Sequence, residues 1–174
     1  MPGQIYPGAA ANNLDLYQVN CTFYDALGQR GNEYLIARAV QFFVPGIPQV
    51  YYVGLLAGTN DMELLARTKV GRDINRHYYT PAEVAAALGN SVVRNLIELI
   101  RIRNNHPSFA VKANIETPSD QKLVITWKEN DHWAKLDVDF GEPQALVTYS
   151  SGDGGGGSIG RWDSETSVSC SKAI

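Results

Sequence analysis

Hydrophobic residues recur at helical spacing in the first half of the chain. In the segment NEYLIARAVQFF the apolar residues of one helical face are Leu35, Ala39, Phe42 and Phe43. This spacing predicts an amphipathic helix over residues 32–43. The turn residues PGIP, 45–48, end that helix. The next run, QVYYVG over residues 49–54, is β-branched and aromatic and ends in glycine, which predicts a short buried strand.

Two further helices are predicted between residues 80 and 106. Thr80-Pro81-Ala82-Glu83 supplies an N-cap hydroxyl, a proline at the first helical position and a glutamate three residues after the cap, and Gly89 ends this helix. Asn90 can cap a second helix. Its apolar stripe comprises Val92, Val93, Leu96, Leu99 and Ile100. On the exposed side, Arg94 and Glu98 are predicted to pair across one turn.

The hydrophobic period changes from 3.6 to two after residue 107. Alternating segments are KLVITWKE over 122–129, HWAKLDVDF over 132–140 and QALVTYS over 144–150. They predict antiparallel strands of a small sheet. We interpret Trp127 and Trp133 as packing between strands, with a carbohydrate-stacking platform as the alternative. His106 and His132 are expected at the surface.

The predicted elements divide the chain into unequal parts. An α/β segment with one or two parallel strands cannot complete a sheet by itself, because such sheets need helices over several strands. We therefore expect an α/β fold in which residues 1–106 form the end of a larger domain and residues 107–150 a small antiparallel β domain. Residues 151–174 are rich in Gly and Ser and are expected to be a disordered tail.

Composition narrows the functional classes. Apolar residues make up 44% of the chain and charged residues 19%, and the net charge is −3. The chain has no basic stripe for nucleic acid and no apolar run near the ~18 residues that span a membrane. The start, MPGQIYPGAA, lacks the features of a secretory signal. Cys21 and Cys170 fit neither a metal pattern nor a disulfide framework. We expect a cytoplasmic protein without metal or other cofactor. The sequence is compatible with either a monomer or a homodimer.

The segment KVGRDINRHYY, Lys69 to Tyr79, concentrates side chains that can donate hydrogen bonds. It is either a solvated basic loop or a set of donors directed at an anion or a sugar. Arg72 is the donor of greatest interest, because a planar guanidinium can bind two adjacent sugar oxygens at once. The alternative for Arg72 is a surface arginine paired with Asp73 or Glu63.

Three segments together resemble sucrose phosphorylases, which are retaining members of the α-amylase superfamily (glycoside hydrolase family thirteen). They are NNLDLYQVNCTFYDALG, ARAVQFFVPGIPQVYYVGLLAGTND and GRDINRHYY. The run PGIPQVYYVG alone is a signal of the superfamily only, whereas the other two segments are narrower. The resemblance is close over about residues 9–110. It implies that residues 1–106 end a (β/α)₈ TIM barrel with QVYYVG as the eighth strand, and that the following sheet is the small C-terminal domain.

The resemblance also implies substrate-binding residues. Arg72 matches the arginine that holds the glucose hydroxyls, and Asp15, Leu16, Tyr17 and Gln18 match a loop that lines the acceptor subsite. In this loop a carboxylate, a phenol and an amide offer hydrogen bonds to fructose or phosphate. Arg76 and His77 are interpreted as ordering the second loop, with direct substrate contact as the alternative.

The implied reaction is transfer of glucose from sucrose to phosphate, which gives glucose 1-phosphate and fructose. Retaining chemistry of this kind needs a nucleophile and an acid/base carboxylate about 5 Å apart. By the resemblance these lie on earlier barrel strands, and their motifs do not occur here, so no catalytic residue is predicted and the chain alone is expected to be inactive. Two alternatives stay open: a phosphorylase of sucrose 6'-phosphate or glucosylglycerate, and a non-catalytic carbohydrate-binding or scaffold domain.

Overall fold

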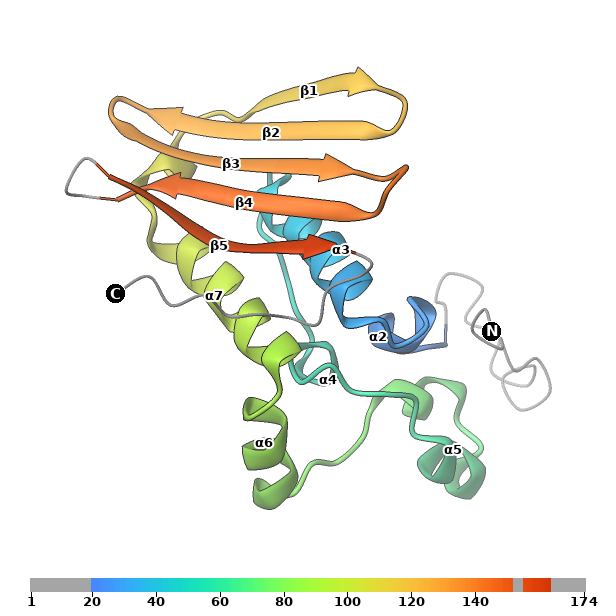
Figure 1. Ribbon diagram of the computed structural model, residues 1–174. Coiled ribbons are helices and arrows are strands. Elements are labelled where there is room, and N and C mark those ends of the chain that lie inside the picture. The colour runs from blue at the N-terminus through green and yellow to red at the C-terminus, as the bar shows by residue number, and fades with distance from the viewer. Residues whose placement is uncertain (1–19, 152–154, 164–174) are drawn as a thin grey trace.

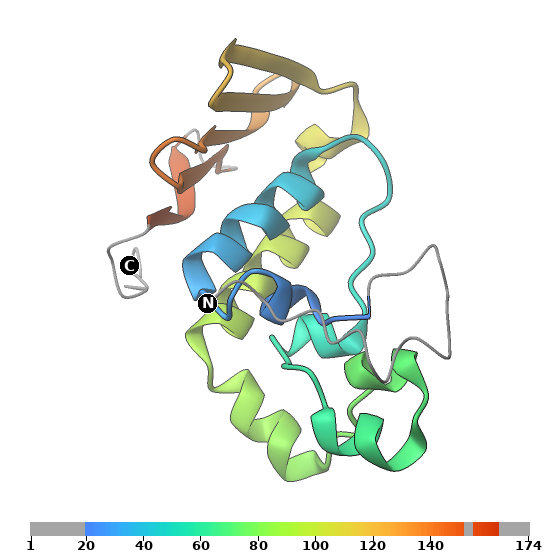
Figure 2. The same cartoon turned by 90° about the vertical axis from the view of Figure 1, so that its right-hand side faces the viewer.

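A layer of helices packs against one face of an antiparallel sheet. The computed structural model describes residues 20–151 and 155–163. Helices α3 and α7 lie side by side beneath the sheet, and α4, α5, η1 and α6 extend away from it (Figures 1 and 2). The coarse expectation of an α/β chain that ends in an antiparallel sheet is therefore confirmed.

Several helices begin next to a residue whose side chain caps them. The bounds of the helices are α2 Phe23–Ala26, α3 Gly31–Phe43, α4 Tyr52–Leu55, α5 Met62–Thr68, η1 Gly71–Asn75, α6 Pro81–Leu88, α7 Ser91–Asn105 and η2 Pro107–Ala110. The predicted helix over 32–43 is α3. Thr80 and Glu83 form the predicted capping box of α6, and Asn90 caps α7 through its side-chain oxygen. The predicted Arg94–Glu98 pair is wrong, because Glu98 pairs with Arg101 one turn later.

The sheet is a meander in which every strand pairs with its neighbour in sequence. Its strands are β1 Asn114–Ser119, β2 Lys122–Glu129, β3 His132–Asp139, β4 Gln144–Ser150 and β5 Gly156–Asp163. All pairings are antiparallel. Strands β2, β3 and β4 were predicted from their alternation, because one of their faces is buried and the other is not.

One hydrophobic core joins the helices to the sheet. Ala134, Leu136 and Val138 of β3 are fully buried, and so are Leu35 of α3 and Leu96 of α7 in the same cluster. The Trp127 indole N–H of β2 donates to the Phe43 carbonyl at the end of α3 at 2.7 Å. The proposed boundary at 106/107 therefore divides the sequence, but apolar side chains from both sides of it pack in one core.

Two segments differ from the sequence prediction. Residues 49–54 do not form a strand, because the backbone is extended at Tyr51 and then turns into α4. A strand needs a neighbour to hydrogen-bond, and none of the described residues supplies one here. Conversely, part of the tail expected to be disordered is strand β5, which pairs with β4 and buries Trp162.

The aromatic and histidine predictions had mixed outcomes. Trp127 is buried in the core as predicted. Trp133 lies opposite Lys128 on the face away from the core, so the interpretation that it packs like Trp127 was wrong. His106 is not a simple surface residue either. Its ring nitrogens lie 2.8 Å from the Ser108 hydroxyl and 2.9 Å from the Ser150 carbonyl, which ties η2 to β4.

Candidate functional site

The loop that follows α5 is anchored at its centre. After an extended Val70, η1 turns through GRDIN, and Gly71 and Ile74 are buried. The Ile74 carbonyl accepts a 2.7 Å hydrogen bond from the Asp61 N–H, at the N-cap of α5. The start and the centre of the segment 61–79 are thereby joined, which fixes where the polar side chains of η1 can reach.

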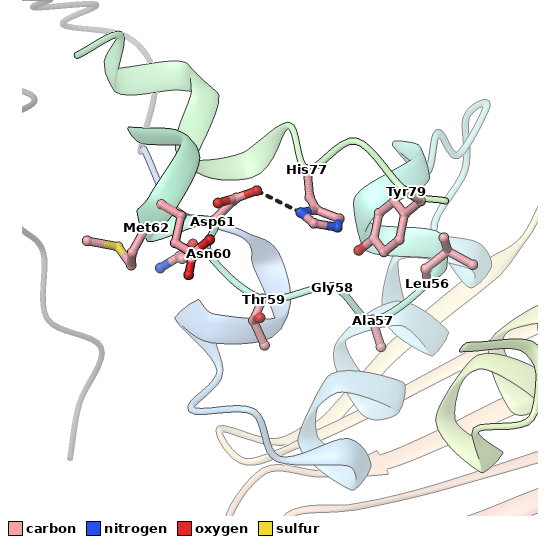
Figure 3. A pocket seen from close by; sticks show the side chains of 10 residues that line it. Leu56, Ala57, Gly58, Thr59, Asn60, Asp61, Met62, His77 and Tyr79 are labelled. Atoms are coloured by element: carbon pink, nitrogen blue, oxygen red, sulfur yellow. Dashed lines mark hydrogen bonds and ion pairs between the residues drawn. The ribbon is translucent and has the colours of Figure 1, made fainter. Parts of the chain in front are cut away.

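His77 connects the N-terminal ends of two helices. Its Nδ1 lies 2.6 Å from the Asp61 carboxylate, and its Nε2 lies 3.2 Å from the Glu83 carboxylate. Asp61 also accepts from the Leu64 N–H at the start of α5, while Glu83 belongs to the capping box of α6. We call this group, Asp61, His77 and Glu83, the histidine clamp. It holds the C-terminal half of the loop between α5 and α6, and Figure 3 shows its Asp61–His77 contact.

The clamp changes the pKa of all three groups. The hydrogen bond that His77 donates to the Asp61 carboxylate raises the pKa of His77 against the opposing effect of burial. Burial works to raise the pKa of the Asp61 carboxyl, but hydrogen bonds from the Leu64 N–H and from His77 outweigh it and hold that pKa below its usual value. Hydrogen bonds from the Thr80 backbone and hydroxyl, then from His77, lower the pKa of Glu83. The clamp therefore favours a protonated imidazole between two carboxylates.

Tyrosine rings surround the histidine. The Tyr52 hydroxyl donates to the His77 carbonyl at 2.9 Å, and the Tyr79 ring meets the imidazole edge to face at 4.6 Å between centroids. Burial first, then the neighbouring Tyr51 hydroxyl, raises the pKa of Tyr52 to about 12. A Cβ at Gly58 would lie 2.0 Å from the Tyr79 hydroxyl. Glycine at 58 is therefore required for this placement of Tyr79.

These groups border a pocket of about 520 Å³. Figure 3 shows the Asp61, His77 and Tyr79 side chains around it. Its lining residues are Leu56, Ala57, Gly58, Thr59, Asn60, Asp61, Met62, Glu63, His77 and Tyr79. Such a mixture of carboxylates, hydroxyls and amide groups suits hydrogen bonding to a polyhydroxylated ligand. In the described part of the chain, no group of three or more His, Cys, Asp or Glu side chains could hold a metal ion.

The predicted site residues are only partly placed. Arg72 is exposed in η1, outside the lining of the pocket, and pairs with neither Asp73 nor Glu63 within the described residues. The other predicted residues, Asp15, Leu16, Tyr17 and Gln18, lie outside the described residues. The structure therefore leaves their predicted roles as predictions.

Sequence reasoning missed two members of the clamp. It identified His77 as a loop-ordering residue, and Glu83 only as part of a helix cap. Asp61 carried a usable signal, because it precedes the helical segment MELLART as an N-cap aspartate. Asp61 and His77 are 16 residues apart in the sequence, and His77 and Glu83 are 6 apart. Local sequence pattern could not predict these two contacts, because they depend on how α5 and α6 approach each other.

Comparison with known proteins identifies close relatives. No protein-family model matches the chain. A sucrose phosphorylase of Agrobacterium vitis is 57% identical over 143 residues, which cover 82% of this chain and 29% of that enzyme. A sucrose phosphorylase of Bifidobacterium adolescentis is 48% identical over 160 residues, or 86% of this chain and 32% of that enzyme. The chain thus spans less than a third of the length of these curated relatives.

A solved structure supports the same relationship. The crystal structure of sucrose 6F-phosphate phosphorylase from Thermoanaerobacter thermosaccharolyticum aligns with a TM-score of 0.78 and 43% sequence identity. The alignment covers 81% of this chain and 29% of that one. Over about four fifths of its length, the chain is therefore similar to sucrose phosphorylases and to a sucrose 6F-phosphate phosphorylase, and it corresponds to less than a third of their length.

Proposed function

We propose that this chain is a portion of a sucrose phosphorylase that binds substrate while the reacting carboxylates lie elsewhere in the longer enzyme. The complete enzyme would transfer glucose from sucrose to phosphate with retention, releasing fructose and α-D-glucose 1-phosphate. The observation that carries this proposal is the 57% identity to a sucrose phosphorylase over 82% of the chain. Sucrose, phosphate, glucose 1-phosphate and fructose are the proposed partners, and the proposed location is the cytoplasm.

In this proposal residues 1–106 complete a (β/α)₈ barrel and residues 107–150, extended by β5, form the small β domain. The extended backbone of Tyr51 supports a barrel strand that ends there, because a strand needs neighbouring strands to pair with. Active sites of such barrels lie at the ends of the strands, on the loops. The loop held by the histidine clamp is well suited to that position.

Within this function Arg72 binds the hydroxyls of the transferred glucose. Its exposure and its lack of an ion pair within the described residues leave the guanidinium available for two sugar oxygens. The residues Asp15, Leu16, Tyr17 and Gln18 serve the acceptor subsite, which alternately holds fructose and phosphate. The histidine clamp orders the loop from its far end and leaves Arg72 free to reach the ligand.

The direct test is reconstitution of activity from two polypeptides. The chain would be mixed with the part of the Agrobacterium vitis enzyme that it does not match, and phosphate-dependent release of glucose 1-phosphate from sucrose would be measured. We expect activity from the pair and none from either polypeptide alone.

Replacing Arg72 should weaken catalysis by the reconstituted pair. Loss of a charged hydrogen bond predicts that Arg72→Ala lowers kcat/KM about 10- to 100-fold. The exposed Arg101→Ala serves as control and should retain full activity. An inactive wild-type pair that has associated would contradict the proposal.

The relative with a solved structure makes a second acceptor testable. That protein is named for sucrose 6F-phosphate, whereas the loop LDLYQ has no basic residue for an acceptor phosphate. We therefore expect the reconstituted pair to make sucrose from glucose 1-phosphate and fructose faster than it uses fructose 6-phosphate. The reverse preference would assign the chain to the sucrose 6F-phosphate enzymes.

A further inference from the structure

Arg38 is a charged residue at the centre of helix α3, and it is only 5% exposed. Its guanidinium carbon lies 4.4 Å from the centre of the Phe23 ring and 4.9 Å from that of the Tyr34 ring. One terminal nitrogen donates to the Gln41 amide oxygen at 2.6 Å, and the other donates to the Tyr34 hydroxyl at 2.9 Å. All of these contacts are to neutral groups.

The charge of Arg38 is not balanced within the described part of the chain. No described carboxylate lies within ion-pair distance of it, and its Nε is buried without a hydrogen-bond partner. An arginine cannot avoid this cost by losing its proton, because its side chain stays charged in proteins. A buried charge without an opposite charge is strongly unfavourable, and native proteins pair such groups.

The backbone around Arg38 is shaped to admit the guanidinium. A Cβ at Gly54 would lie 2.5 Å from the terminal nitrogen of Arg38, so only glycine allows this approach. The Gly54 carbonyl is already occupied by the Tyr34 hydroxyl. The cation is therefore held in place by α4 and by two aromatic rings, while none of its contacts with described residues supplies a negative charge.

A pocket of about 200 Å³ opens beside this guanidinium. Its lining residues are Cys21, Thr22, Phe23, Arg38, Tyr51, Val53, Gly54 and Asn75. Since a water molecule occupies about 30 Å³ of liquid volume, the pocket has room for an acidic side chain. Two of its lining rings are exposed: Phe23 is 38% exposed and Tyr51 54% exposed.

We propose that this pocket is a docking site for an Asp or Glu side chain from the remainder of the longer enzyme. The inference rests on the proposed function, because that function supplies the missing part of the polypeptide. The chain spans only 29% of its Agrobacterium vitis relative, so most of that protein is available to cover this face. The carboxylate would balance Arg38, and the exposed rings of Phe23 and Tyr51 would pack against apolar neighbours of that acidic residue.

The proposed contact also lies next to η1, the short helix that carries Arg72. Asn75, the last residue of η1, lines this pocket, and Arg72 lies in the same short helix. An acidic residue docked on Arg38 would thus fix the longer enzyme against the element that carries Arg72. Docking and positioning of the glucose-binding arginine would then share one surface.

The test compares two arginines that are both stacked on a pair of aromatic rings. Arg103 lies over Phe109 and Trp127, its Nε also lacks a partner, and it is more exposed than Arg38. Affinity between the chain and the unmatched part of the Agrobacterium vitis enzyme would be measured for the wild type, Arg38→Met and Arg103→Met. The melting temperature of each chain alone would be measured in parallel.

We expect Arg38→Met to weaken association at least tenfold without lowering the melting temperature of the isolated chain, because methionine removes an unbalanced charge and keeps the apolar packing. Arg103→Met should leave affinity within threefold of the wild type, because Arg103 does not line the pocket. Unchanged affinity of Arg38→Met would overturn the inference, and so would unfolding of that variant when isolated, since Arg38 would then serve internal packing.

The remaining outcomes are equally decisive. If inorganic phosphate raises the melting temperature of the wild-type chain but not of Arg38→Met, and association is independent of Arg38, the occupant is a free anion and the docking site is wrong. If the wild-type chain does not associate with the unmatched part of the Agrobacterium vitis enzyme, that part supplies no acidic side chain to the pocket. The inference then fails together with the proposed function. Association through Arg38 without release of glucose 1-phosphate would leave the docking site intact and refute the proposed function alone.

Discussion

At the scale of single residues, His77 is the group whose charge most affects the candidate site. Its two ring nitrogens each meet a carboxylate, and one of these carboxylates starts α5 while the other starts α6. The clamp is strongest when the imidazole is protonated and both carboxylates are ionised. Its strength should therefore depend on pH in a direction that the pKa shifts determine.

The pKa of His77 is raised in the folded chain, so its contribution to stability is fully present below the unfolded value of about 6.5 and is lost as pH rises through the folded value. The pKa of Asp61 is lowered, so its contribution is lost only when pH falls through that lower value. We expect the melting temperature to fall by a few degrees at most between pH 6 and pH 9, because the pair is partly exposed.

His77→Gln is the matched variant, since it keeps a hydrogen-bonding side chain without the titratable charge. Its melting temperature should change less over the same pH range than that of the wild type. Proton NMR of the three histidines, assigned with this variant, would give the pKa of His77 directly. A value at or below that of an unperturbed histidine would contradict the clamp.

At the scale of elements, prediction from sequence succeeded where one face of an element is buried or where a capping motif marks its start. The alternation in KLVITWKE and QALVTYS marks β2 and β4, and the capping box at Thr80 marks α6. Prediction failed where the formation of a strand depends on whether a neighbouring strand is available to pair with it. The run QVYYVG has strand composition but no described neighbour to pair with, whereas the Gly-rich β5 has weak strand composition but finds the open edge of β4.

Strand β5 matters to stability because of one side chain. Trp162 is 2% exposed and lies opposite Ala145 of β4. We expect Trp162→Ala to destabilise the chain by about 3–5 kcal/mol, as removal of a large buried aromatic side chain usually does. Urea unfolding would measure this change.

Trp133→Ala is the control, because Trp133 lies on the face of the sheet away from the core. Its cost should be well below that of Trp162→Ala. Equal costs for the two substitutions would show that β5 does not close the core as described.

At the scale of the whole molecule, the helices and the sheet share one core. The residues that join them lie far apart in the sequence, and so the sequence pattern could not reveal the contact. Phe43 and Trp127, for example, are linked by a hydrogen bond across 84 positions. The candidate site lies mostly on elements that extend from the sheet (Figure 1), and its pocket meets the core at Ala57. Its predicted part before residue 20 lies outside the described residues.

The shared core predicts a single cooperative unfolding transition for the chain. Far-ultraviolet circular dichroism reports mainly the helices, whereas fluorescence reports the tryptophans at 127, 133 and 162, all in the sheet. We expect both signals to give the same urea midpoint. Two separate midpoints would mean that the segments before and after residue 106 unfold independently.

The order of the strands has a consequence for biosynthesis. Since α3 leaves the ribosome more than a hundred residues before Trp162, its apolar face waits on the order of ten seconds for the last strand at typical rates of translation. During that interval the nascent chain offers an uncovered surface to chaperones. Stalling the ribosome while Trp162 is still inside the exit tunnel should therefore promote aggregation more than stalling after a downstream linker has let Trp162 leave the tunnel.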